Sequence, residues 1–296
     1  MTKKKVAYRI SVYAALVVLV LLFLFPIYMI INISLFTEAD MLEIPRRLFP
    51  SSLHFANFVE VIKVVGRVVD DYGQEGGYLF LRYIGNSLLV VVLYVVGCVL
   101  SSSICAYSFS KIKFKGRNVA FMVVLATMMI PGSVTIIPLY SIYKTVGMID
   151  TLFPLWLPIW FGGGAVNIFL LRQFMRSFPN EVLESADIDG AGHVRKYLQI
   201  VMPNIIPGLL YVALTSALSV WNDFQTPLLY VYRQDLWTLS RGVAAMGTNK
   251  AQSSGYVTIE HLKFAACLIM SVFPLTLFIA GQKFFIESVT ISGLKG

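Results

Sequence analysis

Charged residues are scarce in this chain of 296 residues, and their scarcity limits the class of protein. Only 14% of the residues are charged, whereas 57% are hydrophobic, and the mean hydropathy is +0.74. The apolar residues also gather in runs of 18 or more, which are long enough to cross the hydrocarbon core of a bilayer. The sequence therefore predicts a polytopic integral membrane protein rather than one or two soluble domains.

Residues that would indicate a disulfide, a metal site or a nucleotide-binding site are also few. The three cysteines, Cys98, Cys105 and Cys267, all lie in apolar runs, so we expect small core side chains rather than disulfides or thiolate ligands. The three histidines are scattered, and no metal site is expected. No phosphate-cradling GxxxxGK[ST] motif is present, so this chain is expected to hold no cofactor and to hydrolyse no ATP.

The net charge of +8 does not indicate a nucleic-acid partner. Basic residues are not interleaved with aromatic ones on any soluble stretch, as a nucleic-acid surface would require. In a membrane protein the same charge reports topology, because Lys and Arg stay on the cytoplasmic side.

The apolar runs predict an all-α protein with about six transmembrane helices. Only helices satisfy the backbone within each spanning segment. The expected spans are residues 12–36, 84–109, 119–143, 151–171, 204–232 and 262–282. In the fourth span, Gly162-Gly163-Gly164 predicts close helix packing rather than a substrate site.

The distribution of charge predicts that both termini are cytoplasmic. On that orientation the inside segments carry 14 of the 24 basic residues and 5 of the 16 acidic ones. The short loop 110–118 alone has four basic residues and no acid. Residues 37–83 and 233–261 then become extracytoplasmic loops, and residues 172–203 become a long cytoplasmic loop.

The cytoplasmic loop predicts a helix, a bend and a second helix beside the membrane. Pro179-Asn180 followed by acidic residues is a good helix start, because carboxylates favour the positive N-terminal end. Gly190 and Gly192 then permit a bend or a positive φ, and a helix can resume before Pro203. Such an element is a lever with a docking surface rather than a catalytic site.

The same loop resembles the "EAA" signature of bacterial ABC importer permeases. The matching residues, at the family's spacing, are Glu184, Ser185, Ala186, Gly190, Ile200, Met202 and Pro203. Ser185 stands where the family has the first Ala of the signature, and Met202 where it has Leu. Residues 184–192, the Trp221-Asn222-Asp223-Phe224 string and the tail 291–296 are similar to the carbohydrate-uptake branch, in particular to second permeases of the maltose-transporter type.

The resemblance implies a type I ABC importer permease fold in a bacterial cytoplasmic membrane. It also implies a set of partners: a second, homologous permease, an ATPase dimer that holds ATP and Mg, an extracytoplasmic solute-binding protein, and membrane lipid. The residues it associates with ATPase coupling are Glu184, Ser185, Ala186, Asp189, Gly190, Ile200 and Pro203, and those of an ATPase-contacting tail are Gly293, Lys295 and Gly296.

A polar face in the fifth expected span suggests a substrate path. Asp223 is the only acid placed within a span, and intramembrane carboxylates are usually functional. The neighbours that would share this path with Asp223 are Ser219, Trp221, Asn222 and Thr226. The opposing interpretation, which we favour, is that Asp223 ties this helix to a neighbour.

The resulting hypothesis is a non-catalytic permease subunit that forms half of the path for a sugar or oligosaccharide. A permease for another solute, such as a peptide or phosphate, stays open. A membrane-embedded enzyme would need clustered intramembrane His, Glu or Asp, and a self-sufficient channel would leave the signature at 184–203 unexplained.

Overall fold

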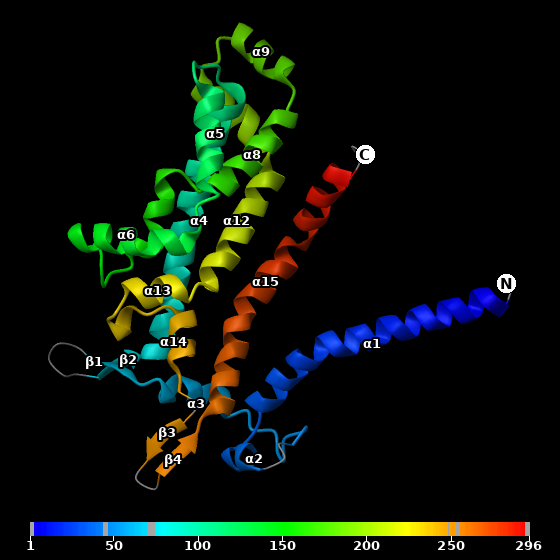
Figure 1. Cartoon of the computed structure of the whole chain (residues 1–296), viewed down its shortest axis with the longest axis vertical. Helices are drawn as coiled ribbons and strands as arrows, with labels where there is room; N and C mark the ends of the chain where they lie inside the picture. Colours follow the sequence, from blue (N-terminus) through cyan, green and yellow to red (C-terminus); the bar gives the residue numbers. More distant parts are fainter. Residues whose placement is uncertain (1–2, 44–46, 70–74, 248, 253–254, 294–296) are drawn as a thin grey trace. The chain divides into compact units, whose positions relative to one another are not determined.

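The structure is a computed structural model that describes residues 3–43, 47–69, 75–247, 249–252 and 255–293. Its contacts divide the chain into a first unit, residues 1–81 with 242–272, and a second unit, residues 82–241 with 273–296. Figure 1 gives the labels of the helices and strands. The first unit contains α1 (Lys3–Ser34), α2 (Glu38–Leu42), α3 (Asn57–Val64), β1 (Arg67–Val69), β2 (Glu75–Tyr78), β3 (Asn249–Gln252) and β4 (Gly255–Thr258).

Three helices continue from one unit into the other: α4 (Leu79–Lys111), α14 (Leu239–Ala245) and α15 (Glu260–Gly293). The remaining elements belong to the second unit. They are α5 (Arg117–Thr127), α6 (Gly132–Thr145), α7 (Phe153–Trp156), the 3₁₀ helix η1 (Pro158–Phe161), α8 (Ala165–Ser177), α9 (Asn180–Ile188), α10 (His193–Arg195), the π-helix η2 (Lys196–Val201), α11 (Met202–Asn204), α12 (Ile206–Trp221), α13 (Gln225–Tyr230) and the 3₁₀ helix η3 (Gln234–Leu236).

The predicted all-α architecture is confirmed, with two short hairpins added to it. Four segments of the described chain are long and apolar enough to span a membrane: Ser11–Ser34, Leu79–Lys111, Phe153–Ser177 and Glu260–Gln282. Two bent pairs, α5 with α6 and residues 193–204 with α12, raise the number to six if each pair is one span. The hairpins β1–β2 and β3–β4 are antiparallel, and they lie in the segments that the sequence marks only as external loops.

Several expected spans are broken rather than continuous, and Pro or Gly stands at the breaks in the third and fourth spans. The third span bends by 96° between α5 and α6, where Pro131 precedes the second helix and supplies no N–H. The fourth breaks at Gly162, Gly163 and Gly164, whose φ values are +138°, +70° and +82°. The fifth ends its long helix at Trp221 and resumes at Gln225.

Side chains of α4 and α8 pair the backbone carbonyls that the break in the fourth span frees. Ser101 Oγ donates to Ile159 O at 2.9 Å, and Asn167 Nδ2 donates to Gly163 O at 2.9 Å. Cys98 Sγ also points at Gly163 O, at 3.4 Å. Irregular backbone at membrane depth is tolerated where protein groups satisfy it in this way.

The core of the second unit lies where α4, α8 and α12 meet, as Figure 1 shows. Cys98 of α4, Leu171 and Met175 of α8, and Val212 of α12 are fully buried in this cluster, together with Val201 of η2. Glycine permits the closest approaches, as the glycine triplet predicts for Gly163: a Cβ there would lie 2.4 Å from Ser102 N.

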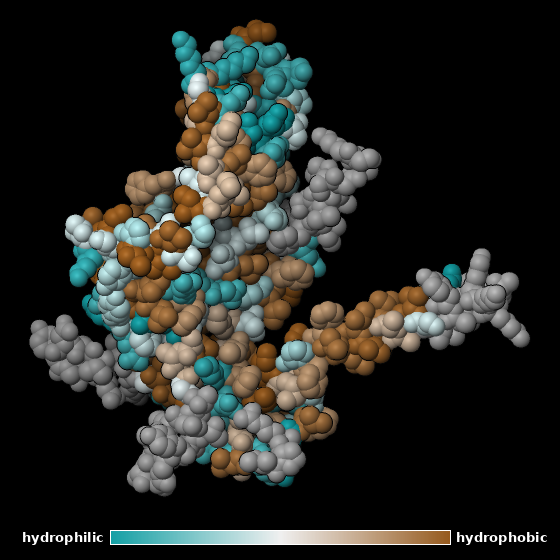
Figure 2. All heavy atoms as spheres, in the orientation of Figure 1, coloured by the Kyte–Doolittle hydropathy of each residue, from teal (hydrophilic) through white to brown (hydrophobic). Residues whose placement is uncertain are grey.

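In the first unit, the end of α1 and the following turn form a small core. Ile33, Phe36 and Met41 pack against Phe264 of α15. Buried Asn57 donates to Ser34 O and Phe36 O, at 2.8 and 2.9 Å. By contrast, the most apolar 18-residue stretch of α1 has no buried residue, and Figure 2 shows hydrophobic side chains along this helix.

Replacement of Gly163 by Ala tests the packing of α8 on α4. The added methyl group collides with Ser102 backbone, so we expect a loss of about 1–3 kcal/mol from overpacking, beyond the strain of a positive φ. Gly162→Ala is the matched control, because it has a positive φ but open space around its Cβ. Thermal unfolding in detergent should give Gly163→Ala the lower Tm, and equal Tm values would contradict the packing argument.

Candidate functional site

The cytoplasmic loop predicted from the sequence forms two helical segments separated by a tight bend. The first is α9, whose N-cap is Pro179. Its buried side chains are Leu183 and Ala186, whereas Ile188 at its end is 89% exposed. The second runs through α10, η2 and α11 and meets α12 at an angle of 78°. A helix with one packed face and one free face can both hold to its own subunit and receive a partner.

The bend after α9 is a Schellman motif centred on Gly190. Gly190 N donates to Asp187 O at 3.0 Å, and Ala191 N donates to Ala186 O at 2.9 Å. Gly190 has a φ of +74°, which the motif requires and which glycine adopts without a Cβ penalty. A Cβ at Gly190 would meet no atom of this chain within 4 Å, so only the backbone conformation restricts this residue within the subunit.

Two lysines fasten the two ends of α9 to the rest of the second unit. Lys111, at the end of α4, donates to Phe178 O at 2.7 Å and to Asn180 Oδ1 at 2.8 Å. Lys196 of η2 bonds Asp187 Oδ1 at 2.5 Å. Its side chain is only 8% exposed, whereas that of Asp187 is 59% exposed, so the ammonium group is the buried partner. Sequence reasoning missed both contacts.

The structure separates the predicted coupling residues into exposed and packed sets. Glu184, Ser185 and Asp189 are exposed, and Ser185 Oγ bonds Glu181 O of its own helix at 2.9 Å. Ile200 packs against the core of the second unit, and Pro203 is exposed within α11, just before the bend into α12. Figure 2 shows polar side chains gathered around the α9 end of this unit.

A groove of about 470 Å³ lies between α9 and the end of α4. Glu184 lines it together with Asp187, and basic side chains of the predicted inside loop lie opposite, namely Lys113 and Arg117. The predicted tail is only partly described: Gly293 is the last residue of α15, and Lys295 and Gly296 lie outside the described residues.

The residues predicted for a substrate path do not form one site. Trp221 is buried and stacks on Phe273 with ring centroids 4.2 Å apart, so this face is not open to a solute. Asn222 Nδ2 bonds Leu218 O of its own helix at 2.8 Å, and Ser219 is exposed. Thr226 lines a pocket between α6 and α13.

Asp223 has a local structural contact. Its Oδ1 accepts a hydrogen bond from Thr226 N at 3.0 Å, which caps the start of α13. Its backbone carbonyl accepts from Ser240 Oγ at 2.6 Å. The connection to the neighbouring segment is therefore made by the main chain of Asp223 and not by its carboxylate.

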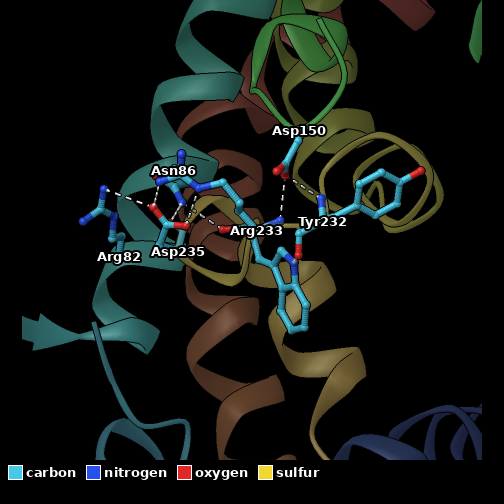
Figure 3. A network of polar contacts seen from close by, with 7 residues as sticks. Arg82, Asn86, Asp150, Tyr232, Arg233 and Asp235 are labelled. Carbon is cyan, nitrogen blue, oxygen red and sulfur yellow. Dashed lines mark hydrogen bonds and ion pairs between the residues drawn. The ribbon is translucent and has the colours of Figure 1, made fainter. Parts of the chain in front are cut away.

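A polar network holds the segment that follows the C-terminal end of α13 (Figure 3). Asp150 Oδ1 accepts from Tyr232 N at 2.9 Å and from Arg233 N at 2.7 Å. Asp235 pairs with Arg233 at 2.8 Å and lies 3.7 Å from Arg82 of α4. The network fixes residues 232–235 against both α4 and the turn between α6 and α7.

Arg241 completes this arrangement from the buried side. Its Nη1 donates to Pro227 O within α13 and to Val231 O just beyond it, and its guanidinium lies 4.4 Å from the centroid of the Trp237 ring. Burial lowers the pKa of this guanidinium from its ordinary value, but arginine stays a cation in proteins. It therefore serves as a positive cap for α13.

Comparison with known proteins identifies the family. Residues 98–290 match the model of the "binding-protein-dependent transport system inner membrane component" family. The arabinooligosaccharides transport system permease protein AraQ of Bacillus subtilis is 27% identical over 291 residues, which cover 98% of this chain and 96% of AraQ. The sn-glycerol-3-phosphate transport system permease protein UgpE of Yersinia enterocolitica is 28% identical over 277 residues, 94% of each chain.

A solved structure supports the same fold. The crystal structure of a bacterial ABC transporter that imports the acidic polysaccharide alginate contains a chain with a TM-score of 0.79 and 21% sequence identity. The match covers 96% of this chain and 99% of that one. The family match extends over well more than half of the chain and includes all of α9 and its bend. The chain therefore belongs to the binding-protein-dependent transport system inner membrane components, as a multi-pass, non-catalytic permease subunit of an ABC importer that works with an ATPase and a solute-binding protein.

Proposed function

We propose that α9 and the bend at Gly190 dock this permease on its ATPase, and that the imported solute is a sugar or oligosaccharide. The observation that carries the docking proposal is the two-faced construction of α9. Glu184, Ser185 and Asp189 are exposed on it, while Lys111 and Lys196 hold it to α4 and η2. Movement imposed on α9 would therefore pass to the helices that shape the path.

Exposed apolar side chains support docking at the same place. Ile188 at the end of α9 is 89% exposed, and Val194 just beyond the bend is 72% exposed. Large apolar side chains in a polar surrounding favour a protein partner. In this proposal, Ala186 and Gly190 give the close approach, Ile200 and Pro203 form the hinge toward α12, and the tail residues Gly293, Lys295 and Gly296 reach the ATPase.

The sugar assignment rests on resemblance and on a named relative. The carbohydrate-type strings of the sequence agree with the arabinooligosaccharide function in the name of AraQ. A non-sugar solute is the second candidate, because UgpE, of comparable identity, is named for sn-glycerol-3-phosphate. We further propose that the second permease is a homologous but different chain, and that both termini are cytoplasmic.

A side chain at Gly190 should separate docking from folding. We expect Gly190→Asp to leave the chain inserted, because its Cβ meets open space and Asp tolerates a positive φ better than most residues. On the ATPase surface, however, the added carboxylate would disturb close packing. Copurification should therefore show loss of the ATPase subunits, or their hydrolysis should no longer respond to the loaded binding protein.

The matched control for this variant is Gly116→Asp. Gly116 also has a positive φ, +80°, and no atom within 4 Å of an added Cβ, and it lies in another predicted cytoplasmic loop. It should keep full ATPase binding and coupling. Full coupling in Gly190→Asp would remove the main support for α9 as the docking element.

Removal of the Lys196 charge should loosen α9 without removing its docking surface. We expect Lys196→Met to retain the ATPase but to lower the stimulation of hydrolysis by the loaded binding protein by about tenfold, since hydrogen bonds to charged groups contribute about 1.5–3 kcal/mol. Asp187→Asn should have a similar effect. The control, Arg195→Met, removes an exposed side chain that bonds only Gln199 among the described residues, and a loss of equal size there would contradict the proposal.

Thiol labelling should test the orientation. In a background with Ser in place of the three native cysteines, Asn118→Cys should react only with a reagent supplied from the cytoplasm, because its loop is strongly basic. Ser52→Cys, exposed in the segment 37–83, should react only from outside. Labelling of both positions from the same side would contradict the six-span topology.

A further inference from the structure

A pocket of about 380 Å³ lies within the second unit, between α6, α7 with η1, and α13. Its wall includes Ser133 in the first turn of α6, Tyr143 near the end of that helix, and Gln225, Thr226 and Tyr230 of α13. These helices belong to the third and fifth expected spans, so the pocket is at membrane depth. Its volume is within the range of about 300–1,000 Å³ that small-molecule sites occupy.

Several polar groups of this wall have no partner among the described residues. The hydroxyls of Ser133, Tyr143 and Tyr230 and the amide of Gln225 make no hydrogen bond to another described side chain or main-chain group. Such groups are costly in a membrane span unless they face a cavity that holds water or a polar solute. The four groups therefore give the pocket hydrogen-bonding capacity that water or a polar solute can use.

The aromatic and charge content of the wall narrows the class of ligand. Tyr143 meets Tyr230 edge to face, with centroids 5.1 Å apart, which gives the pocket an aromatic side beside its hydroxyl and amide groups. Its lining has no Lys, Arg, His, Asp or Glu. Phosphates and carboxylates are usually bound by Arg or Lys, so a neutral ligand with apolar C–H faces and hydroxyl edges fits the wall best.

The network around Asp150 contacts one residue of the pocket wall, Tyr230, at the end of α13. Asp150 N donates to Tyr230 O at 2.7 Å, and its carboxylate holds the two residues after Val231 through Tyr232 N and Arg233 N. Asp150 has a φ of +62°, the one positive φ of a non-glycine residue in the described chain. These hydrogen bonds hold the turn between α6 and α7 against the end of α13, as Figure 3 shows for Asp150 and Tyr232.

We propose that this pocket is a subsite for a neutral sugar ring on the translocation path, with Gln225 and the hydroxyls of Ser133, Tyr143 and Tyr230 as its hydrogen-bonding groups. The inference rests on the proposed function, which it deepens by placing the sugar on α6 and α13 rather than on the face of Trp221 and Asp223.

The test uses the whole importer, with its second permease, ATPase and binding protein, in proteoliposomes. The probes are radiolabelled arabinotriose, diacetylchitobiose and sn-glycerol-3-phosphate. Tyr143→Phe and Gln225→Leu remove pocket groups with little change of shape. We expect each to lower the number of sugar molecules imported per ATP hydrolysed by about tenfold, because a site that loses a hydrogen-bonding partner loses affinity for the hydroxyl it held, while the complex assembles in normal yield.

The matched control is Tyr140→Phe, one turn earlier on α6. It removes a hydroxyl that bonds Tyr232 Oη at 3.0 Å and does not line the pocket, so its sugar-to-ATP ratio should stay at the wild-type value. Sugar import that Tyr143→Phe and Gln225→Leu leave unchanged, or that Tyr140→Phe lowers equally, would overturn the subsite while leaving the proposed function intact. Wild-type import of sn-glycerol-3-phosphate and of neither sugar would instead contradict the sugar class itself.

Discussion

Two lysine ammonium groups hold α9 against the helices of the second unit. The proposed coupling of α9 to the ATPase depends on these two contacts. Lys111 reaches the start of α9 from α4, and Lys196 reaches Asp187 near its end from η2. A short helix has little stability by itself, so these contacts and the burial of Leu183 and Ala186 give α9 its fixed position. The remaining face carries the exposed signature residues, so a single helix can hold to its own subunit and, as we propose, receive the ATPase.

The breaks in the expected membrane spans also bring separate segments of the second unit together. Proline and glycine interrupt the third and fourth expected spans, and Ser101 and Asn167 donate hydrogen bonds to the carbonyls freed at Ile159 and Gly163. The break before α6 and the gap before α13 also bring two short helix starts to one pocket. Continuous helices would separate these groups along their length, whereas the short segments bring hydroxyl and amide groups to one pocket.

The sequence predicts the long helices, the family and the bend at Gly190, because these depend on local patterns: apolar length, charge distribution, and glycine at a helix end. It does not predict the partners of side chains far apart in the chain. Lys111 and Asn180 are 69 residues apart, and no local pattern joins them. The substrate path expected around Trp221 stays a prediction, and the sequence does not show that Trp221 is buried, since its stacking on Phe273 depends on tertiary packing. The sequence does not predict the pocket that Tyr143 and Gln225 line either, because its polar residues come from separate expected spans.

The most direct test of α9 as the coupling helix is photo-crosslinking from its exposed end. A benzophenone amino acid at Ile188, which is 89% exposed, should form an adduct with the ATPase subunit in the assembled importer, and nucleotide should change its yield if α9 follows closure of the ATPase. The same amino acid at Ser52 should give no ATPase adduct. Absence of an ATPase adduct from Ile188 in an importer that still hydrolyses ATP in response to its binding protein would contradict the assignment of α9 as the coupling helix.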